Sequence, residues 1–143
     1  MRRLPIKHVV SAGGVVYRNP TGEIEVLICG QTEPTIWGLP KGTPAAGESI
    51  QETARREVRE ETGIEGEIVA PLDSIHYWFT RNRVRFSKTV HWFLMIPAGG
   101  DISLHDREFD VVKWVDANEA VRLLSYANEV ELVRKALEVV SKK

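Results

Sequence analysis

A chain of 143 residues with 19 Lys and Arg, 20 Asp and Glu and a net charge of −1 is long enough to bury its own core, so we expect one domain over residues 1–143. The balanced charge gives no general reason for attraction to nucleic acid, and we predict no stable nucleic acid partner. Because the chain has no run of about 18 apolar residues and no apolar stretch behind its basic N-terminus, we expect no membrane association and no secretory signal. We therefore expect a cytoplasmic protein, monomeric or a homodimer.

The N-terminal part of the chain predicts two strands joined by a tight turn. Residues 8–17 and 23–29 are rich in Val and Ile. The sequence Asn-Pro-Thr-Gly at 19–22 is a turn signal, so we expect a β-hairpin. The lone Cys29 lies in an apolar run and is interpreted as a buried strand residue.

The spacing of apolar residues becomes helical after residue 49. Ser49 and Glu52 have the separation of a capping box, and Gly63 suits the left-handed residue that ends many helices, so a helix is predicted over 50–61. Further strands are expected at 67–72, 75–80, 85–95 and 111–115, and helices at 117–124 and 128–140. These elements predict an α+β fold, in which a mixed β-sheet is flanked by helices in an α/β/α sandwich.

The helix predicted after Ser49 carries an acidic stripe. At about 100° per residue, Glu57 and Glu61 fall on its apolar face, and Glu60 flanks Glu57. Like charges at this spacing repel, and partial burial disfavours their ionised forms. A divalent cation would remove this conflict. The alternative interpretation is an exposed charged helix with pairs such as Glu52 and Arg56.

Nine positions around this helix match a known signature. Gly42, five residues, Glu48, seven residues and then Arg56-Glu57-Val58-Arg59-Glu60-Glu61-Thr62-Gly63-Ile64 contain every fixed position of the Nudix box. The chain therefore resembles the Nudix hydrolases. The resemblance implies a Nudix fold and a pyrophosphohydrolase that uses Mg²⁺ or Mn²⁺.

The same resemblance implies roles for residues of the box. The implied metal ligands are oxygen atoms of Glu57, Glu60, Glu61 and the backbone carbonyl at Gly42 or its neighbour Lys41. Arg56 would orient the catalytic glutamates through an ion pair with Glu48. The general base stays open between Glu57 and a glutamate outside the box.

Segments outside the box resemble the diadenosine polyphosphate hydrolase branch of the family: 11–14, 37–42, 88–94, and Glu108 with Trp114. The loop at 43–47 departs from this branch, because it lacks an acidic residue that many relatives carry. The resemblance implies that Glu108 is a remote catalytic or metal-binding carboxylate. The candidate substrate-binding residues are basic or aromatic: Lys41, Arg83, Arg85, Lys88, Tyr77 and His91, with His76 and Trp78 as further stacking surfaces.

Each of these residues also has a purely structural interpretation. The basic strand residues could form a solvated face, and we interpret Trp37, Trp78 and Trp92 as packing residues. The implied partner is a small-molecule nucleotide. The leading hypothesis is cleavage of diadenosine polyphosphates by attack of water on phosphorus. Hydrolysis of nucleoside triphosphates, oxidised ones included, is the alternative. Capped RNA ends, inositol pyrophosphates and a noncatalytic nucleotide-sensing module are further alternatives.

Overall fold

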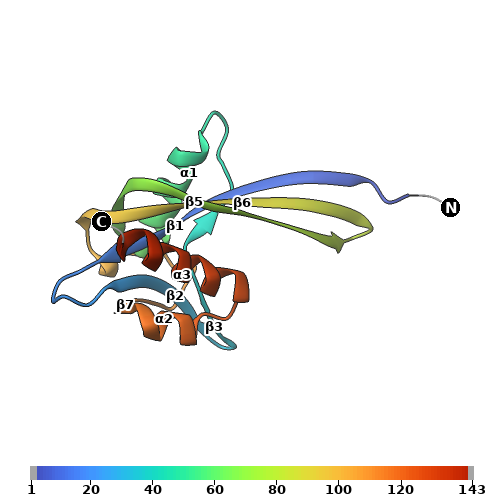
Figure 1. The fold of residues 1–143 in the computed structure, drawn as a ribbon. Coiled ribbons are helices and arrows are strands. Elements are labelled where there is room, and N and C mark those ends of the chain that lie inside the picture. The colour runs from blue at the N-terminus through green and yellow to red at the C-terminus, as the bar shows by residue number, and fades with distance from the viewer. Residues whose placement is uncertain (1–2, 142–143) are drawn as a thin grey trace.

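The computed structural model describes residues 3–141 as a mixed sheet with helices on both faces (Figure 1). Its strands are β1 (Ile6–Arg18), β2 (Glu25–Thr32), β3 (Thr35–Gly38), β4 (Lys41–Gly42), β5 (Ile64–Arg81), β6 (Val84–Gly100) and β7 (Val111–Asp116). Its helices are α1 (Ile50–Thr62), the short 3-10 turn η1 (Ile102–Leu104), α2 (Ala117–Leu123) and α3 (Ala127–Ser141). The predicted α+β class is confirmed. Within residues 3–141, no helix is long and apolar enough to cross a membrane.

Strand β1 lies at the centre of the sheet. It pairs in parallel with β6, from Ile6 opposite Arg85 to Val16 opposite Met95. Its last two residues pair antiparallel with β2, which also carries β3 and β7. The predicted hairpin of β1 and β2 is therefore present, but it is short. A strand buried on both faces, as β1 is over residues 11–16, is typical of parallel pairing inside a sheet.

Two apolar cores lie on the two faces of the sheet. The core beneath α2 and α3 contains Trp92 and Val133, and the core beneath α1 contains Val58 and Met95. Cys29 is fully buried in the α1 core, as predicted. Because successive side chains of a strand point to opposite faces, β1 and β6 contribute to both cores.

The ends of α1 follow the predicted signals. The Ser49 hydroxyl accepts a hydrogen bond from the Glu52 backbone N–H at 3.1 Å, and the Glu52 carboxylate accepts one from the Ser49 N–H at 3.0 Å. Gly63 has the left-handed φ of 80°. Glu52 therefore caps the helix, while Arg56 forms its ion pairs with other residues.

Strands β5 and β6 form one long hairpin. The predicted break between residues 72 and 75 is wrong, because irregularities of register near Ile68 and Pro71 interrupt the pairing with β6 without ending β5. The turn residues Asn82 and Arg83 have φ values of 51° and 62°, which suit the tight turn of a twisted hairpin. The outer end of this hairpin and the start of β1 extend beyond the helices (Figure 1). We call residues 6–10 and 76–89 the arm.

Candidate active site

The loop from Pro40 to Gly42 lies against β1 next to α1. The Gly14 N–H donates to the Pro40 carbonyl at 3.2 Å. A side chain at Gly13 would overlap that carbonyl, and a side chain at Gly42 would overlap the Glu57 carboxylate. Glycine at these positions therefore lets the backbone of the loop approach the carboxylates of α1.

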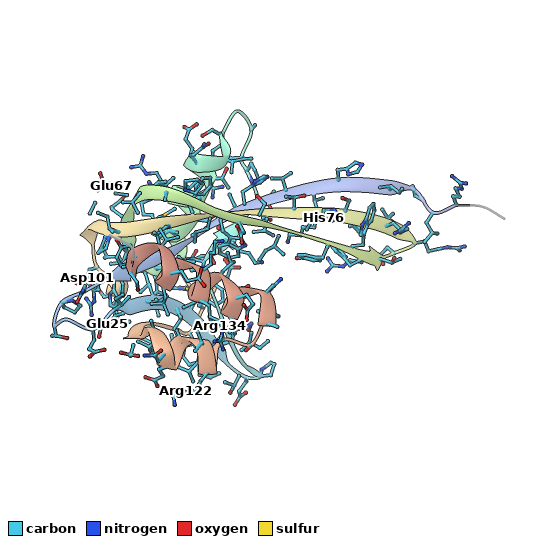
Figure 2. The ribbon with its side chains drawn as sticks, in the orientation of Figure 1. Glu25, Glu67, His76, Asp101, Arg122 and Arg134 are labelled. Carbon is cyan, nitrogen blue, oxygen red and sulfur yellow. The ribbon has the colours of Figure 1, made fainter. Side chains whose placement is uncertain are left out.

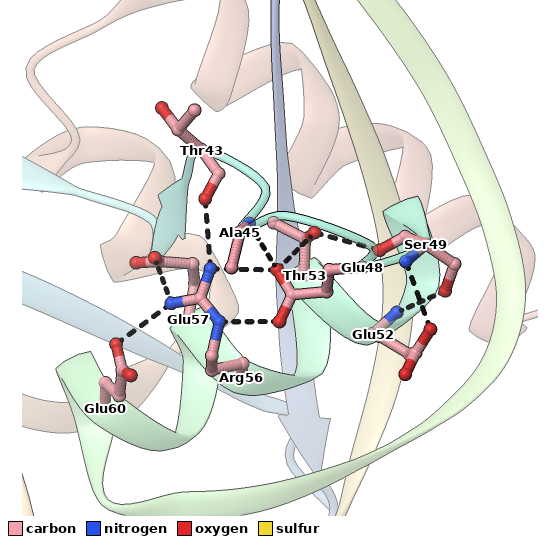
Figure 3. A network of polar contacts seen from close by, with 9 residues as sticks. All are labelled: Thr43, Ala45, Glu48, Ser49, Glu52, Thr53, Arg56, Glu57 and Glu60. Atoms are coloured by element: carbon pink, nitrogen blue, oxygen red, sulfur yellow. Dashed lines mark hydrogen bonds and ion pairs between the residues drawn. The ribbon is translucent and has the colours of Figure 1, made fainter.

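Arg56 joins this loop to the acidic face of α1 (Figure 3). Its Nε and Nη2 donate to the two carboxylate oxygens of Glu48 at 2.7 and 2.9 Å. Nη1 donates to Glu57 Oε1 at 2.8 Å and Glu60 Oε2 at 3.1 Å, and Nη2 also donates to the Thr43 carbonyl at 2.9 Å. The ion pair of Arg56 with Glu48 implied by the resemblance is thus present. The network holds three carboxylates in defined orientations.

Glu61 is the most buried carboxylate of α1, with 2% of its surface exposed. Burial, the hydrogen bond with Glu57 and the charges of Glu108 and Glu57 raise the pKa of Glu61 well above its usual range. The backbone N–H of Lys41 opposes this rise. Among residues 3–141, Glu61 Oε2 has no hydrogen-bond partner. A buried oxygen in this state is unfavourable unless a positive charge approaches it.

Glu108, in the loop that precedes β7, lies near Glu61. Glu61, Glu108 and Lys41 line a cavity of about 220 Å³, which we call the carboxylate cavity. Burial and the nearby charges of Asp106 and Glu57 raise the pKa of Glu108, while Lys41 opposes that rise. The fold therefore brings the remote carboxylate together with those of α1.

The donors at this site suit a hard divalent cation. Mg²⁺ prefers oxygen ligands and usually takes one or two carboxylates together with water and substrate phosphate. A cation would supply the charge that Glu61 Oε2 lacks. Within residues 3–141, no three His, Cys, Asp or Glu side chains are gathered closely enough to hold an ion by themselves. Arg56 hydrogen-bonds one oxygen each of Glu57 and Glu60, and water and substrate phosphate would complete the ligand set of an ion bound there.

A second cavity of about 340 Å³ shares Lys41, Tyr126 and Glu129 with the first. Its other lining residues are mostly apolar or aromatic, and we call it the aromatic cavity: Ile75, Tyr77, Val90, Trp92 and Asn128. Trp92 is 2% exposed, and its Nε1 has no hydrogen-bond partner among residues 3–141. Apolar walls with a few polar groups are typical of small-molecule sites.

Three lining residues near the start of α3 were missed by the sequence analysis: Tyr126, Asn128 and Glu129. Glu129 is 4% exposed, and its Oε1 accepts a hydrogen bond from the Leu39 N–H at 2.8 Å. It thereby fixes the segment that leads to Lys41. A signal was present in the sequence, since Glu129 shares an i, i+3, i+4, i+7 stripe with the buried Leu132, Val133 and Ala136.

The predicted substrate-binding residues do not all lie at one place in the structure. Lys41 lines both cavities, and Tyr77 lines the aromatic cavity. Lys88 lies opposite Tyr77 in the register of β5 and β6. His91 lies on the other face of the sheet from Trp92, where its Nδ1 is 3.0 Å from the Ser74 hydroxyl.

The arginines and the neighbouring tryptophan lie farther out. Arg83 belongs to the turn, so it does not continue the alternation of the strand that holds Arg85. The Arg85 guanidinium is 4.5 Å from the centre of the Trp78 ring, on the face of the arm opposite Tyr77. Trp78 is 46% exposed, so its interpretation as a packing residue is wrong, whereas Trp92 is buried as interpreted.

Comparison with known proteins establishes the class. Residues 7–136 match the NUDIX domain family model, so the chain belongs to the Nudix family. It is a hydrolase domain of the kind that acts on phosphoric anhydride bonds of nucleotide-type substrates, and the family generally uses divalent metals.

The chain is similar to several individual members of the family. The chain is 40% identical to MutT4 of Mycobacterium tuberculosis (strain CDC 1551 / Oshkosh) over 147 residues, which cover 98% of this chain but only 59% of that protein. It is 30% identical to the asymmetrical bis(5'-nucleosyl)-tetraphosphatase of Caenorhabditis elegans over 129 residues, covering 89% and 93% of the two chains. A crystal structure of a binary complex of the C. elegans Ap4A hydrolase has a similar fold, with a TM-score of 0.68 and 24% identity over 94% of this chain and 99% of that one.

Proposed function

We propose that this chain hydrolyses dinucleoside polyphosphates, with Mg²⁺ or Mn²⁺ held by Glu57, Glu60 and Glu61 as the Nudix resemblance implies. The observation that carries the proposal is that the aromatic and carboxylate cavities share Lys41. A nucleoside in the first cavity would therefore extend its phosphates into the second. The similarity to the C. elegans tetraphosphatase over 93% of its length supports this substrate class.

Residues of both cavities would bind and orient the substrate. Tyr77 and Tyr126 provide aromatic surface for one base, and the Lys41 ammonium would bind the phosphates. Arg56 holds Glu57 and Glu60 at the edge of the site. A divalent ion bound there would neutralise phosphate charge and lower the pKa of the attacking water.

The hydrolytic step needs a carboxylate to accept the proton of that water. Glu57 and Glu108 are the candidates, because both lie beside Glu61. The water oxygen forms a bond to phosphorus, and the bridging phosphorus–oxygen bond breaks. The leaving nucleotide departs with the electron pair of that bond, so two nucleotides are produced.

A nucleoside triphosphate is the second candidate substrate. The aromatic cavity, at about 340 Å³, has room for one nucleoside, and this observation fits a substrate with a single base. The two candidates differ in whether a second nucleoside adds to binding.

A substrate panel tests the proposal. Turnover of diadenosine polyphosphates, nucleoside triphosphates, 8-oxo-dGTP and ADP-ribose is measured by chromatography of the products with Mg²⁺ present, and Glu57→Gln serves as the inactive control. We expect kcat/KM for the best diadenosine polyphosphate to exceed that for ATP by about tenfold or more, since one additional stacked base contributes on the order of 1–3 kcal/mol. Preference for a nucleoside triphosphate would overturn the dinucleoside assignment.

A further inference from the structure

The arm has a different charge from the rest of the molecule. Residues 6–10 and 76–89 contain five Lys and Arg and no Asp or Glu, although the whole chain has a net charge of −1. The remainder of the chain therefore carries a net charge of −6. Such a concentration of positive charge on one projecting element favours a polyanionic partner.

One face of the arm combines three of these five cations, Lys7, Arg81 and Lys88, with aromatic rings. Phe79 and Phe86 lie opposite each other in register, with ring centroids 4.8 Å apart and nearly parallel planes. Tyr77 is the next ring along β5, 6.1 Å from Phe79, and the Arg81 guanidinium is 5.6 Å from the same Phe79 ring. Lys7 of β1 is in register with Phe86, so it lies on this face as well.

This face continues into the aromatic cavity. Along β5, Ile75 and Tyr77 line the cavity, and Phe79 and Arg81 follow on the same side of the strand. Along β6, Trp92 and Val90 line the cavity, and Lys88 and Phe86 follow. A strip of rings and cations thus leads from the cavity to the tip of the arm. We call it the arm strip.

We propose that the arm strip binds a single-stranded polynucleotide and directs its terminal nucleotide toward the aromatic cavity. Proteins that bind single strands combine a basic track for the phosphates with aromatic side chains on which bases stack, and the arm strip has both. This binding goes beyond the proposed function and does not depend on which anhydride is hydrolysed. The proposal differs from our prediction of no stable nucleic acid partner, which was based on the net charge of −1. That total does not show that positive charge is concentrated on the arm and negative charge on the rest of the chain.

A second copy of this chain is the competing occupant, since the body is acidic. The strip opens into the aromatic cavity, so a folded body docked along it would obstruct the route to the proposed site, whereas an extended strand would not. On the opposite face of the arm, the Trp78 ring is already stacked with Arg85 at 4.5 Å and contacted by His76 at 5.5 Å. The Tyr77 side is the face that continues into the aromatic cavity, and it is therefore the proposed binding face.

Fluorescence anisotropy with a labelled single strand of about 12 nucleotides tests the proposal, with separate RNA and DNA probes and no divalent metal, so that hydrolysis does not interfere. The variant is Lys7→Ala/Arg81→Ala, because both residues are exposed and neither lines a cavity. We expect it to weaken binding by about tenfold or more at low salt and to reduce the slope of log K against log salt by about 0.7 per cation removed.

The matched control is Arg122→Ala/Lys135→Ala, which removes the same two kinds of charge from α2 and α3. Arg122 lies on the body, far from His76 of the arm (Figure 2). We expect wild-type binding in this control. A second variant, Phe79→Leu/Phe86→Leu, removes rings without changing charge, and we expect about fivefold weaker binding or more. Circular dichroism confirms that each variant is folded.

Several outcomes would overturn the proposal. They are absence of polynucleotide binding to the wild-type protein, equal losses in the arm variant and its control, or a dimer in analytical ultracentrifugation that dissociates when Lys7 and Arg81 are replaced. Glu57→Gln separates this proposal from the proposed function, because it should abolish hydrolysis and retain polynucleotide binding. If the wild-type protein bound the polynucleotide but hydrolysed no nucleotide, the proposal for the arm strip would hold and only the proposed enzymatic function would be refuted.

Discussion

Two helices on opposite faces of the sheet each place a buried carboxyl group at the carboxylate cavity. Glu61 of α1 is 2% exposed and Glu129 of α3 is 4% exposed, and burial raises the pKa of each. Their partners differ. Glu129 accepts a hydrogen bond from the Leu39 N–H at 2.8 Å, whereas Glu61 Oε2 has no partner among residues 3–141 and Glu61 also faces other carboxylates.

This difference indicates a structural role for the Glu129 carboxyl group and a ligand-binding role for that of Glu61. Glu129 holds the segment before Lys41 in place through the hydrogen bond that its Oε1 accepts from the Leu39 N–H. The Lys41 N–H favours the charged form of Glu61 only in part, and a cation would stabilise that form further. Burial by itself therefore does not identify a functional carboxylate, and the unpaired oxygen is the more informative observation.

The largest expected effect concerns the carboxylates of α1. Glu57→Gln and Glu61→Gln should each lower kcat by about 10²- to 10⁴-fold, the range for loss of an acid–base group, because they remove a proton acceptor or a metal ligand. Steady-state kinetics with Mg²⁺ measures this loss. Without metal, Glu61→Gln should leave the free energy of unfolding nearly unchanged, since Gln keeps the size of the side chain and the raised pKa keeps the Glu61 carboxyl largely uncharged.

Metal removal sharpens the same comparison. At a concentration about 100 times its Kd, Mg²⁺ should raise the free energy of unfolding of the wild-type protein by about 2.7 kcal/mol. Glu61→Gln should lose most of this gain, and Glu129→Gln should keep it. Chemical denaturation with Mg²⁺ or with EDTA distinguishes the two. If Mg²⁺ raised the free energy of unfolding equally in both variants, Glu61 would not be a metal ligand.

Replacing Glu129 tests the structural half of the comparison. Glu129→Leu leaves the Leu39 N–H unpaired in a buried place, so the free energy of unfolding should fall by about 1–3 kcal/mol. Glu129→Gln retains an acceptor and is the matched control, with a smaller expected loss. The measurement is equilibrium urea denaturation without metal. If the two variants were equally destabilised, the hydrogen bond to Leu39 would not be the reason.

The smallest effect concerns Glu48, a third carboxylate whose partner is already present. Hydrogen bonds from Arg56, from the Ala45 N–H and from the Thr53 hydroxyl lower the pKa of Glu48 to about 2, against 4.5 for an unperturbed Glu. A lowered pKa stabilises the fold above the unfolded value, and this contribution is lost as the pH falls from about 4.5 toward 2.

Glu48→Gln should therefore be less stable than the wild-type protein at neutral pH, and the difference should shrink as the pH falls through this range. Denaturation at a series of pH values measures it, with Glu138→Gln on the exposed side of α3 as the control. A difference between Glu48→Gln and wild type that does not change with pH would contradict the role of the ion pair.

Features that depend on neighbours three to seven residues apart could be predicted from the order of residues. The capping box of Ser49 and Glu52, the left-handed Gly63 and the acidic face of α1 all follow from helical spacing, and the structure contains each of them. The Nudix box was identified in a different way, by its match to the family signature, and most of its fixed positions lie on this one helix and its end. Local geometry was sufficient there because a helix satisfies its own hydrogen bonds.

The contacts between distant segments could be read only from the folded chain. The parallel pairing of β1 with β6, the continuous β5 and the short strand β4 depend on hydrogen bonds between residues far apart in the chain. The same long-range contacts placed Tyr126 and Glu129 beside Lys41. They also gathered the basic residues of three strand segments into an arm, although the overall charge is nearly balanced. Strand pairing is set by register between distant segments, which the local order of residues does not specify.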